Sequence, residues 1–346
     1  MKHGLKMAGL VLATSGLVAG CGSTGSTGSS ATTSGGASGS GSSTGAGSGK
    51  TVDYAAGAAV KPKDGKKLKI GVSFPELDQF LQKVADGVKA RAAEDGVEVS
   101  VVSAEKKVEV QLGQIENFIS QKVDGIIVLP ENTDATDQIT SKVKAANIPL
   151  VYVNRRPAKL DAATPYVGSD SIVAGQLQGQ ELAKLLGNKG NVAILNGDLA
   201  QEAAQLRTKG CKEALEKAGL KVTLEQEGKW YRDKGLSITE NWLQTGKEIN
   251  GICANNDEMA LGAIQALKNA GKLANVKVAG VDATADALKA MAAGDLPVTV
   301  FQDAKGQGAG GVDTIVQMYN KESVPSVVNV PYRLVTPANM AEFQGK

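Results

Sequence analysis

The sequence Gly125-Ile-Ile-Val-Leu-Pro130 is a short apolar run that ends at a proline, and Pro149-Leu-Val-Tyr-Val-Asn154 repeats the pattern. Runs of this length without polar alternation are typical of strands that are covered on both faces, as in parallel sheets. The segment 134–146 between them has a helical pattern. A strand, a helix and a second strand in this order predict a parallel sheet flanked by helices.

The same alternation extends over the chain from residue 67 onward. Strands are predicted at 67–74, 97–103, 125–130, 149–154, 191–196, 221–226, 251–255, 277–281 and 298–302. Helices are predicted near 80–95, 107–121, 134–146, 171–187, 201–218, 233–246, 257–271, 283–293 and 304–320. About 280 residues of such units favour two sheets over one. We therefore expect an α/β fold with two doubly wound, Rossmann-like lobes.

The first twenty residues predict a secretory signal peptide. Lys2 and Lys6 accompany an apolar run, Met7 to Val18, that is too short to remain as a spanning helix. The segment Leu17-Val-Ala-Gly-Cys21 resembles the bacterial lipobox, in which the cysteine is lipidated and becomes the new N-terminus. We expect Cys21 to anchor the protein at the extracytoplasmic face of the cell membrane, followed by a flexible Gly/Ser/Thr-rich tether over 21–66.

Composition excludes several kinds of chemistry. Loss of Lys2 and Lys6 with the signal peptide lowers the basic residues from 38 to 36, equal to the 36 acidic ones. A neutral mature protein lacks the basic excess that nucleic-acid binding requires, so we expect no nucleic-acid partner. The single histidine, His3, lies in the signal peptide. We therefore expect no metal site, no cofactor and no histidine-dependent catalysis, while paired-carboxylate chemistry stays open.

The two remaining cysteines are Cys211, in a helical pattern, and Cys253, in an apolar strand. An exported protein can form a disulfide from such a pair. Buried free cysteines also serve as small hydrophobic residues. The pattern favours two buried thiols, and a disulfide is the alternative.

Polar and aromatic side chains recur after successive predicted strands, where the ligands of parallel sheets bind. These candidate ligand-binding residues are Asp78, Phe80, Asn154, Arg155, Arg207, Trp230, Asn256, Asp282 and Gln302. Carboxylates, amides and guanidinium groups match vicinal hydroxyls, each of which donates and accepts a hydrogen bond. Phe80 and Trp230 offer flat apolar faces for the C–H groups of a ring. The set predicts a site for a small polyhydroxylated molecule.

Individual members of this region have structural alternatives. Asp257 opens a helix, so it is expected to be an N-cap rather than a ligand contact. Asp282 is as compatible with a cap as with a contact, and Arg156 is either solvated or reaches the ligand. Phe80 and Trp230, taken singly, are more often core residues.

The segments Val151-Tyr-Val-Asn-Arg-Arg-Pro157, Asn255-Asn-Asp-Glu-Met-Ala-Leu-Gly-Ala263 and Val281-Asp282 resemble the type I periplasmic sugar-binding proteins. The resemblance covers residues 67 to about 336 and is stronger to inositol- and rhizopine-binding proteins than to ribose-binding ones. It implies a monomer that captures a ligand between two lobes and delivers it to the membrane permease of an ABC importer, without catalysis. It also implies lobes at 67–169 plus 303–328 and at 170–302 plus 329–346, joined by hinges at 168–170, 302–303 and 328–329.

Matching these motifs carries ligand contact onto the nine candidate residues. Leu81 stands where many relatives have a second aromatic residue, and Asn154 stands where many have aspartate. Both departures favour myo-inositol or a related cyclitol over a monosaccharide such as ribose or galactose, which remains the alternative. A carbohydrate hydrolase using Asp78 and Asp282 is a further alternative. A sugar-sensing repressor would need an N-terminal helix-turn-helix domain in place of the signal peptide, and a chemoreceptor-coupled sensor has the same sequence features as a transport protein.

Overall fold

The computed structural model describes residues 50–346, so the predicted signal peptide, Cys21 and residues 22–49 lie outside it. Within that range the larger sheet has seven parallel strands in the order β1-β12-β6-β5-β4-β2-β3. They are β1 (Thr51–Asp53), β2 (Lys69–Phe74), β3 (Glu98–Ser103), β4 (Gly125–Val128), β5 (Leu150–Val153), β6 (Tyr166–Gly168) and β12 (Val327–Asn329). The predicted parallel α/β architecture is confirmed.

The second sheet has four parallel strands in the order β10-β9-β7-β8, and a separate antiparallel pair joins β11 to β13. Their bounds are β7 (Asn191–Asn196), β8 (Lys221–Glu227), β9 (Gly251–Ala254), β10 (Lys277–Ala279), β11 (Thr299–Phe301) and β13 (Arg333–Val335). We call the elements of the seven-stranded sheet, with their helices, lobe one, and those around the four-stranded sheet lobe two.

Nine α-helices lie within residues 50–346, each at a predicted helix. They are α1 (Gln79–Asp95), α2 (Val108–Ser120), α3 (Thr136–Ala145), α4 (Ser171–Leu185), α5 (Glu202–Lys217), α6 (Arg232–Gln244), α7 (Asp257–Asn269), α8 (Ala285–Ala292) and α9 (Ala304–Tyr319). Short 3-10 helices cover Leu273–Asn275 and Met340–Phe343. None of the helices in this part of the chain is long and apolar enough to cross a membrane.

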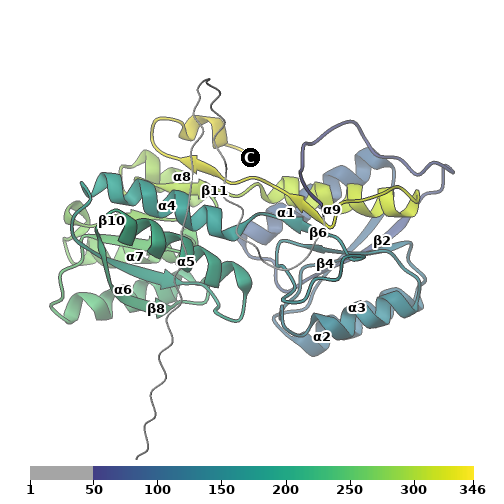
Figure 1. Ribbon diagram of the computed structural model, residues 1–346, viewed down its shortest axis with the longest axis horizontal. Helices are drawn as coiled ribbons and strands as arrows, with labels where there is room; N and C mark the ends of the chain where they lie inside the picture. Colours follow the sequence, from purple (N-terminus) through teal and green to yellow (C-terminus); the bar gives the residue numbers. More distant parts are fainter. Residues whose placement is uncertain (1–49) are drawn as a thin grey trace, which may run out of the picture. The chain divides into compact units, whose positions relative to one another are not determined.

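Helices cover both faces of the larger sheet, with α1 and α9 on one side and α2 and α3 on the other (Figure 1). Successive residues of β4 and β5 therefore enter different cores. Ile127 and Val151 pack with α1 and α9, whereas Ile126 and Leu150 pack with α2 and α3. Because neighbouring side chains of a strand point to opposite faces, each position must be apolar. This burial explains the uninterrupted apolar runs of the sequence.

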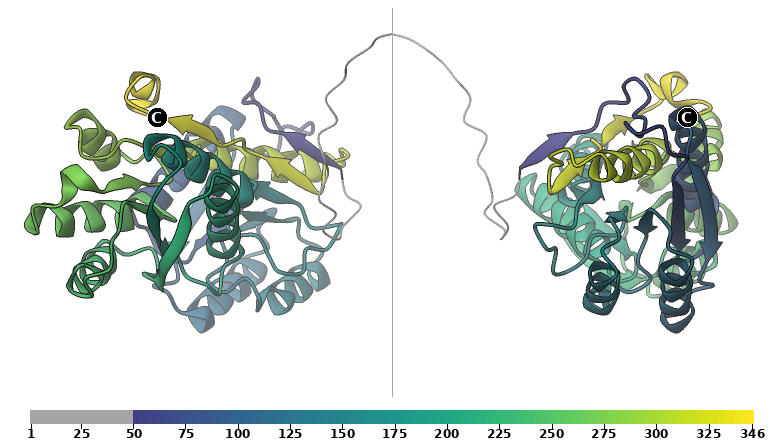
Figure 2. Two further views of the ribbon diagram at one scale, coloured as in Figure 1. Left: turned by 60° about the vertical axis from the view of Figure 1, so that its left-hand side comes forward. Right: turned by 90° about the vertical axis from the view of Figure 1, so that its right-hand side faces the viewer.

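The N-terminal edge of lobe one differs from the prediction. β1 pairs with β12 although the two are far apart in the sequence, and Figure 2 shows the purple strand beside the yellow one. Tyr54 donates to Asp313 at 2.9 Å, and the Val60 N–H donates to Asp95 at 2.9 Å. The prediction of a tether over 21–66 is therefore wrong for its last part, because residues 51–53 form a strand and residues 54–63 make hydrogen bonds to polar side chains of lobe one.

The cysteine prediction also requires correction. Cys211 of α5 and Cys253 of β9 form a disulfide. Both side chains lie in the core between α5 and the four-stranded sheet. The helical and strand patterns correctly placed both residues in the interior, but they carried no information on whether the two side chains face each other there. The bridge ties the helix that carries Arg207 to the strand that leads to Asn256.

The chain passes between the two lobes three times. It leaves β6 for α4, leaves β11 for α9, and leaves β12 for β13. The predicted hinges lie at these passages, and the lobe boundaries and the hinge motion stay predictions.

Candidate functional site

One cavity is bordered by both lobes and contains about 490 Å³ of empty space, part of it open to solvent. Its lining residues come from loops after β2, β5, β7, β8, β9, β10 and β11 and from the first turns of α1 and α5. They are Asp78, Phe80, Leu81, Asn154, Arg155, Gln201, Ala203, Arg207, Trp230, Asn256, Asp282 and Gln302. All nine candidate residues line this cavity, and their contact with a ligand stays a prediction.

Asp78 and Phe80 come from the start of α1 in lobe one. Asp78 is the N-cap of this helix, and its Oδ1 accepts a hydrogen bond from the Leu81 N–H at 2.7 Å. The Phe80 N–H also acts on this carboxylate, which lines the cavity and can accept from a hydroxyl there. Burial raises the pKa of the Asp78 carboxyl, whereas the capped N–H and Arg155 act in the opposite direction. Phe80 also packs against the lobe-one core.

Asn154 and Arg155 follow β5. Asn154 adopts a left-handed backbone conformation with φ 63°, and its side-chain N–H donates to Gln307 at 2.9 Å. Arg155 is buried and donates to the Pro130 carbonyl at 3.3 Å and to the Glu131 carboxylate at 3.2 Å. These bonds hold the Asn154 amide and the Arg155 guanidinium in fixed orientations at the cavity wall.

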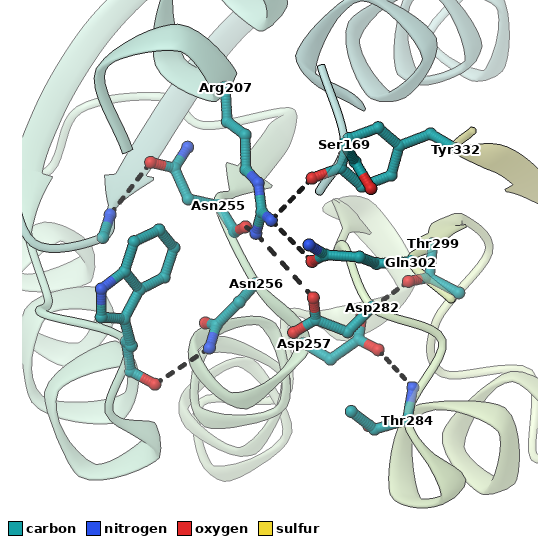
Figure 3. Close-up of polar contacts among 12 residues, drawn as sticks. Ser169, Arg207, Asn255, Asn256, Asp257, Asp282, Thr284, Thr299, Gln302 and Tyr332 are labelled. Atoms are coloured by element: carbon teal, nitrogen blue, oxygen red, sulfur yellow. Dashed lines mark hydrogen bonds and ion pairs between the residues drawn. The ribbon is translucent and has the colours of Figure 1, made fainter. Parts of the chain in front are cut away.

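Arg207 is the centre of the polar network in lobe two (Figure 3). Its Nη1 donates to the Asn255 carbonyl at 2.8 Å, and its Nη2 donates to Gln302 at 2.7 Å and to the Tyr332 hydroxyl at 2.9 Å. The Nε–H is buried and has no hydrogen-bond partner within residues 50–346. A buried unpaired donor is costly in a folded protein, which marks this guanidinium as incompletely satisfied.

Asp282 faces Arg207 with a distance of 3.8 Å between Oδ1 and Nη1. No other residue of the described range donates a hydrogen bond to its carboxylate. Burial raises the pKa of the Asp282 carboxyl well above its ordinary value, and Arg207 opposes this while Asp257 and Asp78 add to it. A hydrogen bond from a ligand hydroxyl, or protonation, would therefore offset the cost of burying this carboxylate.

Trp230 and Asn256 support each other beside Arg207. The Asn256 side chain caps α7 by accepting from the Met259 N–H at 3.1 Å, and it donates to the Trp230 carbonyl at 3.1 Å. The indole ring lies against Gly197, where a Cβ would come within 2.1 Å of it. The Arg207 guanidinium carbon lies 5.6 Å from the ring centroid. Glycine at position 197 thus lets the indole lie flat beside the cavity.

Three of the structural alternatives, for Asp257, Asp282 and Arg156, are addressed by the structure. The predicted N-cap role of Asp257 is wrong, because Asn256 caps the helix and Asp257 is its first residue. The buried Asp257 carboxylate instead accepts from the Thr284 N–H at 2.8 Å and the Thr299 hydroxyl at 2.7 Å. Thr284, and not Asp282, caps α8. Arg156 does not line the cavity, and its guanidinium lies 5.8 Å from the Tyr166 ring centroid.

Three residues of the cavity wall have left-handed backbone conformations. The φ angles are 63° at Asn154, 73° at Trp230 and 122° at Asp282. Such conformations are uncommon for residues with a side chain and tend to occur at functional sites. The cavity is therefore also where the protein holds unfavourable backbone geometry.

The arrangement can bind a small neutral polar molecule. Carboxylate, amide and guanidinium groups of both lobes converge on it, and Phe80 and Trp230 supply aromatic surface. Within the described part of the chain there is no group of His, Cys, Asp and Glu able to hold a metal ion.

A model of the periplasmic binding protein domain matches residues 70–323. The chain belongs to this family. A candidate rhizopine-binding protein of Rhizobium meliloti is 44% identical over 80% of this chain and 93% of its own. A Mycolicibacterium smegmatis xylitol-binding protein is 33% identical over 78% and 77% of the two chains. An ABC-transporter solute-binding protein of Bacillus halodurans, solved with bound myo-inositol, is 48% identical and superimposes with a TM-score of 0.77 over 80% of this chain and 97% of that one.

The predicted family resemblance and the type I fold are thereby confirmed. As a periplasmic binding protein the chain is an extracytoplasmic solute-binding component of ABC transport, and the expectation that it is not an enzyme is confirmed by this membership.

Two residues of the cavity wall, Gln201 and Ala203, were not predicted. The search used positions directly after each strand, whereas Gln201 lies five residues beyond the end of β7 and directly before α5. A search of helix N-termini as well as strand ends would have included it.

Proposed function

We propose that this periplasmic binding protein captures a cyclitol, with myo-inositol favoured, between its lobes and delivers it to an ABC importer. The observation that carries the proposal is the convergence of all nine candidate side chains on one cavity. The broader class of ligand, a sugar or a polyol, is supported by the ligands named for the relatives.

The hydrogen-bonding groups of the cavity fit a ring that carries hydroxyls on several carbons. Lobe one offers the Asp78 carboxylate and the remaining donors of Arg155, and lobe two offers Asp282, the Arg207 guanidinium and the Gln302 amide N–H. Each hydroxyl both donates and accepts, so it can satisfy a carboxylate and a guanidinium together. Discrimination follows, because a ligand without a hydroxyl leaves a buried polar group unpaired.

Two positions favour a cyclitol over ribose. Leu81 is buried and borders the cavity, so this part of the wall has no second aromatic face. Asn154 contributes a neutral amide whose N–H is already bound to Gln307. The similarity to a protein solved with myo-inositol and to a candidate rhizopine-binding protein supports this assignment.

We further propose that ligand binding closes the lobes and that the protein works as a monomer. Contacts between the lobes support closure at the rim of the cavity. The Thr133 hydroxyl donates to the Ala200 carbonyl at 3.0 Å, and the Lys106 ammonium lies 4.1 Å from the Tyr231 ring centroid. A ligand held by both lobes favours the closed state over the open one.

The proposed anchor rests on the lipobox-like segment that ends at Cys21. A Cys21→Ser variant should be released from membranes while its ligand affinity stays unchanged. Membrane retention of this variant would contradict a lipid anchor.

The proposed ligand is tested by titration calorimetry with myo-inositol, scyllo-inositol, xylitol, ribose, galactose and glucose. We expect one site per chain, tightest binding of an inositol, and recovery of the ligand unchanged after long incubation. Tighter binding of a pentose or hexose would contradict the cyclitol assignment and would favour a monosaccharide as the ligand. Release of product from an aryl glycoside would instead support the hydrolase alternative.

A further inference from the structure

Three features of Gln201 together point to contact with a ligand. It lines the cavity, it is only 5% exposed, and its side-chain amide makes no hydrogen bond to any residue between 50 and 346. By comparison, the neighbouring Gln302 amide is half engaged, because its oxygen accepts from Arg207. Because this amide has no protein partner in the described range and keeps surface open to the cavity, its oxygen and its N–H groups are available to a molecule bound there.

The backbone around Gln201 is fixed by several hydrogen bonds. The Gln201 N–H donates to the Asp198 carbonyl at 2.9 Å, the Ala200 N–H donates to the Asp198 carboxylate at 2.9 Å, and the Leu199 N–H donates to Glu227 at 2.9 Å. The adjacent Ala200 carbonyl accepts from Thr133 of lobe one. The amide is therefore presented from a rigid turn at the point where the lobes meet.

The amide has no structural duty at the helix it precedes. Gln201 occupies the N-cap position of α5, but its side chain makes no capping hydrogen bond. This contrasts with Asp78 and Asn256, whose side chains line the same cavity and also cap helices. Replacement of Gln201 thus removes cavity chemistry without removing a cap.

We propose that Gln201 is a specificity-determining residue, whose amide oxygen accepts from one ligand hydroxyl while its N–H donates to an adjacent one. A carboxamide offers an acceptor and a donor side by side, which matches a pair of vicinal hydroxyls. The proposal rests on the proposed function, and it adds that the ligand carries such a pair on the side facing the turn 198–201.

The test is a cycle that combines a protein change with a ligand change, measured by calorimetry. Wild type and Gln201→Leu are titrated with myo-inositol and with a set of inositols that each lack one hydroxyl. At one or two ring positions, removal of the hydroxyl should weaken binding to wild type by about 10- to 100-fold, as expected for the loss of one or two hydrogen bonds. Gln201→Leu should bind myo-inositol more weakly by a similar factor and should lose little further affinity for those same analogues.

Matched variants keep the result interpretable. Gln244→Leu makes the same change at an exposed side chain of α6, in the same lobe and outside the cavity wall, and it should behave as wild type. Gln201→Glu keeps the acceptor oxygen and replaces the donor by a second acceptor, so it should lose the coupling at only one of the two positions. The Gln201→Glu variant also tests the proposal if Gln201→Leu fails to fold.

The outcomes separate the two proposals. If wild type binds inositols but Gln201→Leu shows the same dependence on every hydroxyl, Gln201 is not a specificity residue and the proposed function stands. An equal loss of affinity for all analogues overturns the proposal too, because it indicates a merely structural effect. If wild type binds no inositol, the proposed function fails and this proposal fails with it.

Discussion

Arg91 in lobe one and Arg207 in lobe two are equally buried, each with 5% of its surface exposed. Arg91 has a protein acceptor for each of its three nitrogens. Its Nε donates to Asp313 at 2.5 Å, Nη1 to Glu94 at 2.9 Å and to the Gly57 carbonyl at 3.2 Å, and Nη2 to the Ala58 carbonyl at 2.8 Å. Arg207 has an unpaired Nε and a carboxylate, Asp282, that it approaches only to 3.8 Å.

The difference indicates two uses of the same buried side chain. The acceptors of Arg91 come from α1, α9 and the segment 57–58, so this cation holds the N-terminal segment to the body of lobe one. Arg207 retains hydrogen-bonding capacity at a cavity wall. A buried charge whose bonds the protein completes is structural, and one left incomplete beside a cavity is a candidate for ligand binding.

The largest expected effect is on stability, in Arg91→Met. Removal of the cation leaves the Asp95 and Asp313 carboxylates buried without their partner, which should lower the free energy of unfolding by about 3–5 kcal/mol. Urea denaturation measures this, with Arg333→Met as the control because its ion pair with Glu342 is exposed. Affinity for myo-inositol should stay unchanged. A loss of affinity in a folded Arg91→Met protein would remove the distinction between the two arginines.

The next effect is on binding, in Arg207→Met. Loss of one partner of a buried charged hydrogen-bond network should weaken binding of myo-inositol by about 2–5 kcal/mol. The unfolding free energy without ligand should fall less than in Arg91→Met, because Arg207 pairs with one carboxylate at 3.8 Å, whereas Arg91 pairs with Asp95 at 3.4 Å and with Asp313 at 2.5 Å. Calorimetry and urea denaturation measure the two quantities, and Arg232→Met, an exposed arginine of the same lobe, is the control. Normal affinity in Arg207→Met would assign this residue to the fold.

The smallest expected effect is on the pH dependence of stability, and it comes from Asp95 beside Arg91. Burial raises the pKa of the Asp95 carboxyl to about 7, with a further contribution from Asp313 and an opposing one from Arg91. Between the ordinary pKa of an aspartate and pH 7, the Asp95 carboxyl therefore binds a proton in the folded state that it does not bind in the unfolded state. This contribution stabilises the protein at low pH and is lost as the pH rises through 7.

Asp95→Asn should therefore lose less unfolding free energy than wild type between pH 5 and pH 8, as measured by urea denaturation at both values. Asparagine keeps an oxygen for the Val60 N–H, which Asp95 accepts at 2.9 Å. The raised pKa of Asp257, also about 7, is present in both proteins and cancels in the comparison. An equal pH dependence in the two proteins would exclude Asp95 as its source.

Much of the fold was accessible from the sequence because its helices and longer strands carry full hydrophobic periods. β4 and β5 are four residues long and entirely buried, so their apolar runs are unbroken. β1, β6, β12 and β13 have three residues each, too few for a pattern, and their pairing depends on partners distant in the sequence. The strand β1 was hidden further by its exposed residues, which resemble a linker.

The cavity-lining residues were predictable where a polar residue comes soon after a strand, as Asn154 and Asp282 do. They were not predictable where local chemistry is ambiguous. Asn256 and Asp257 are equally good N-caps by type, and only the start of the helix distinguishes them. The disulfide depended on how α5 packs over β9, which no local pattern contains. Gln201 was missed because it lies five residues beyond the end of β7, directly before α5, and only strand ends were searched.

Lobe one is completed by the last part of the chain, since Thr51 of β1 pairs with Val327 of β12 and α9 packs against α1. The four-stranded sheet of lobe two is continuous in sequence from Asn191 to Ala279. A polypeptide that emerges N-terminus first therefore cannot finish lobe one until nearly all of it has appeared. Because sequence-distant contacts form slowly, we expect lobe one to complete its fold after the four-stranded sheet of lobe two.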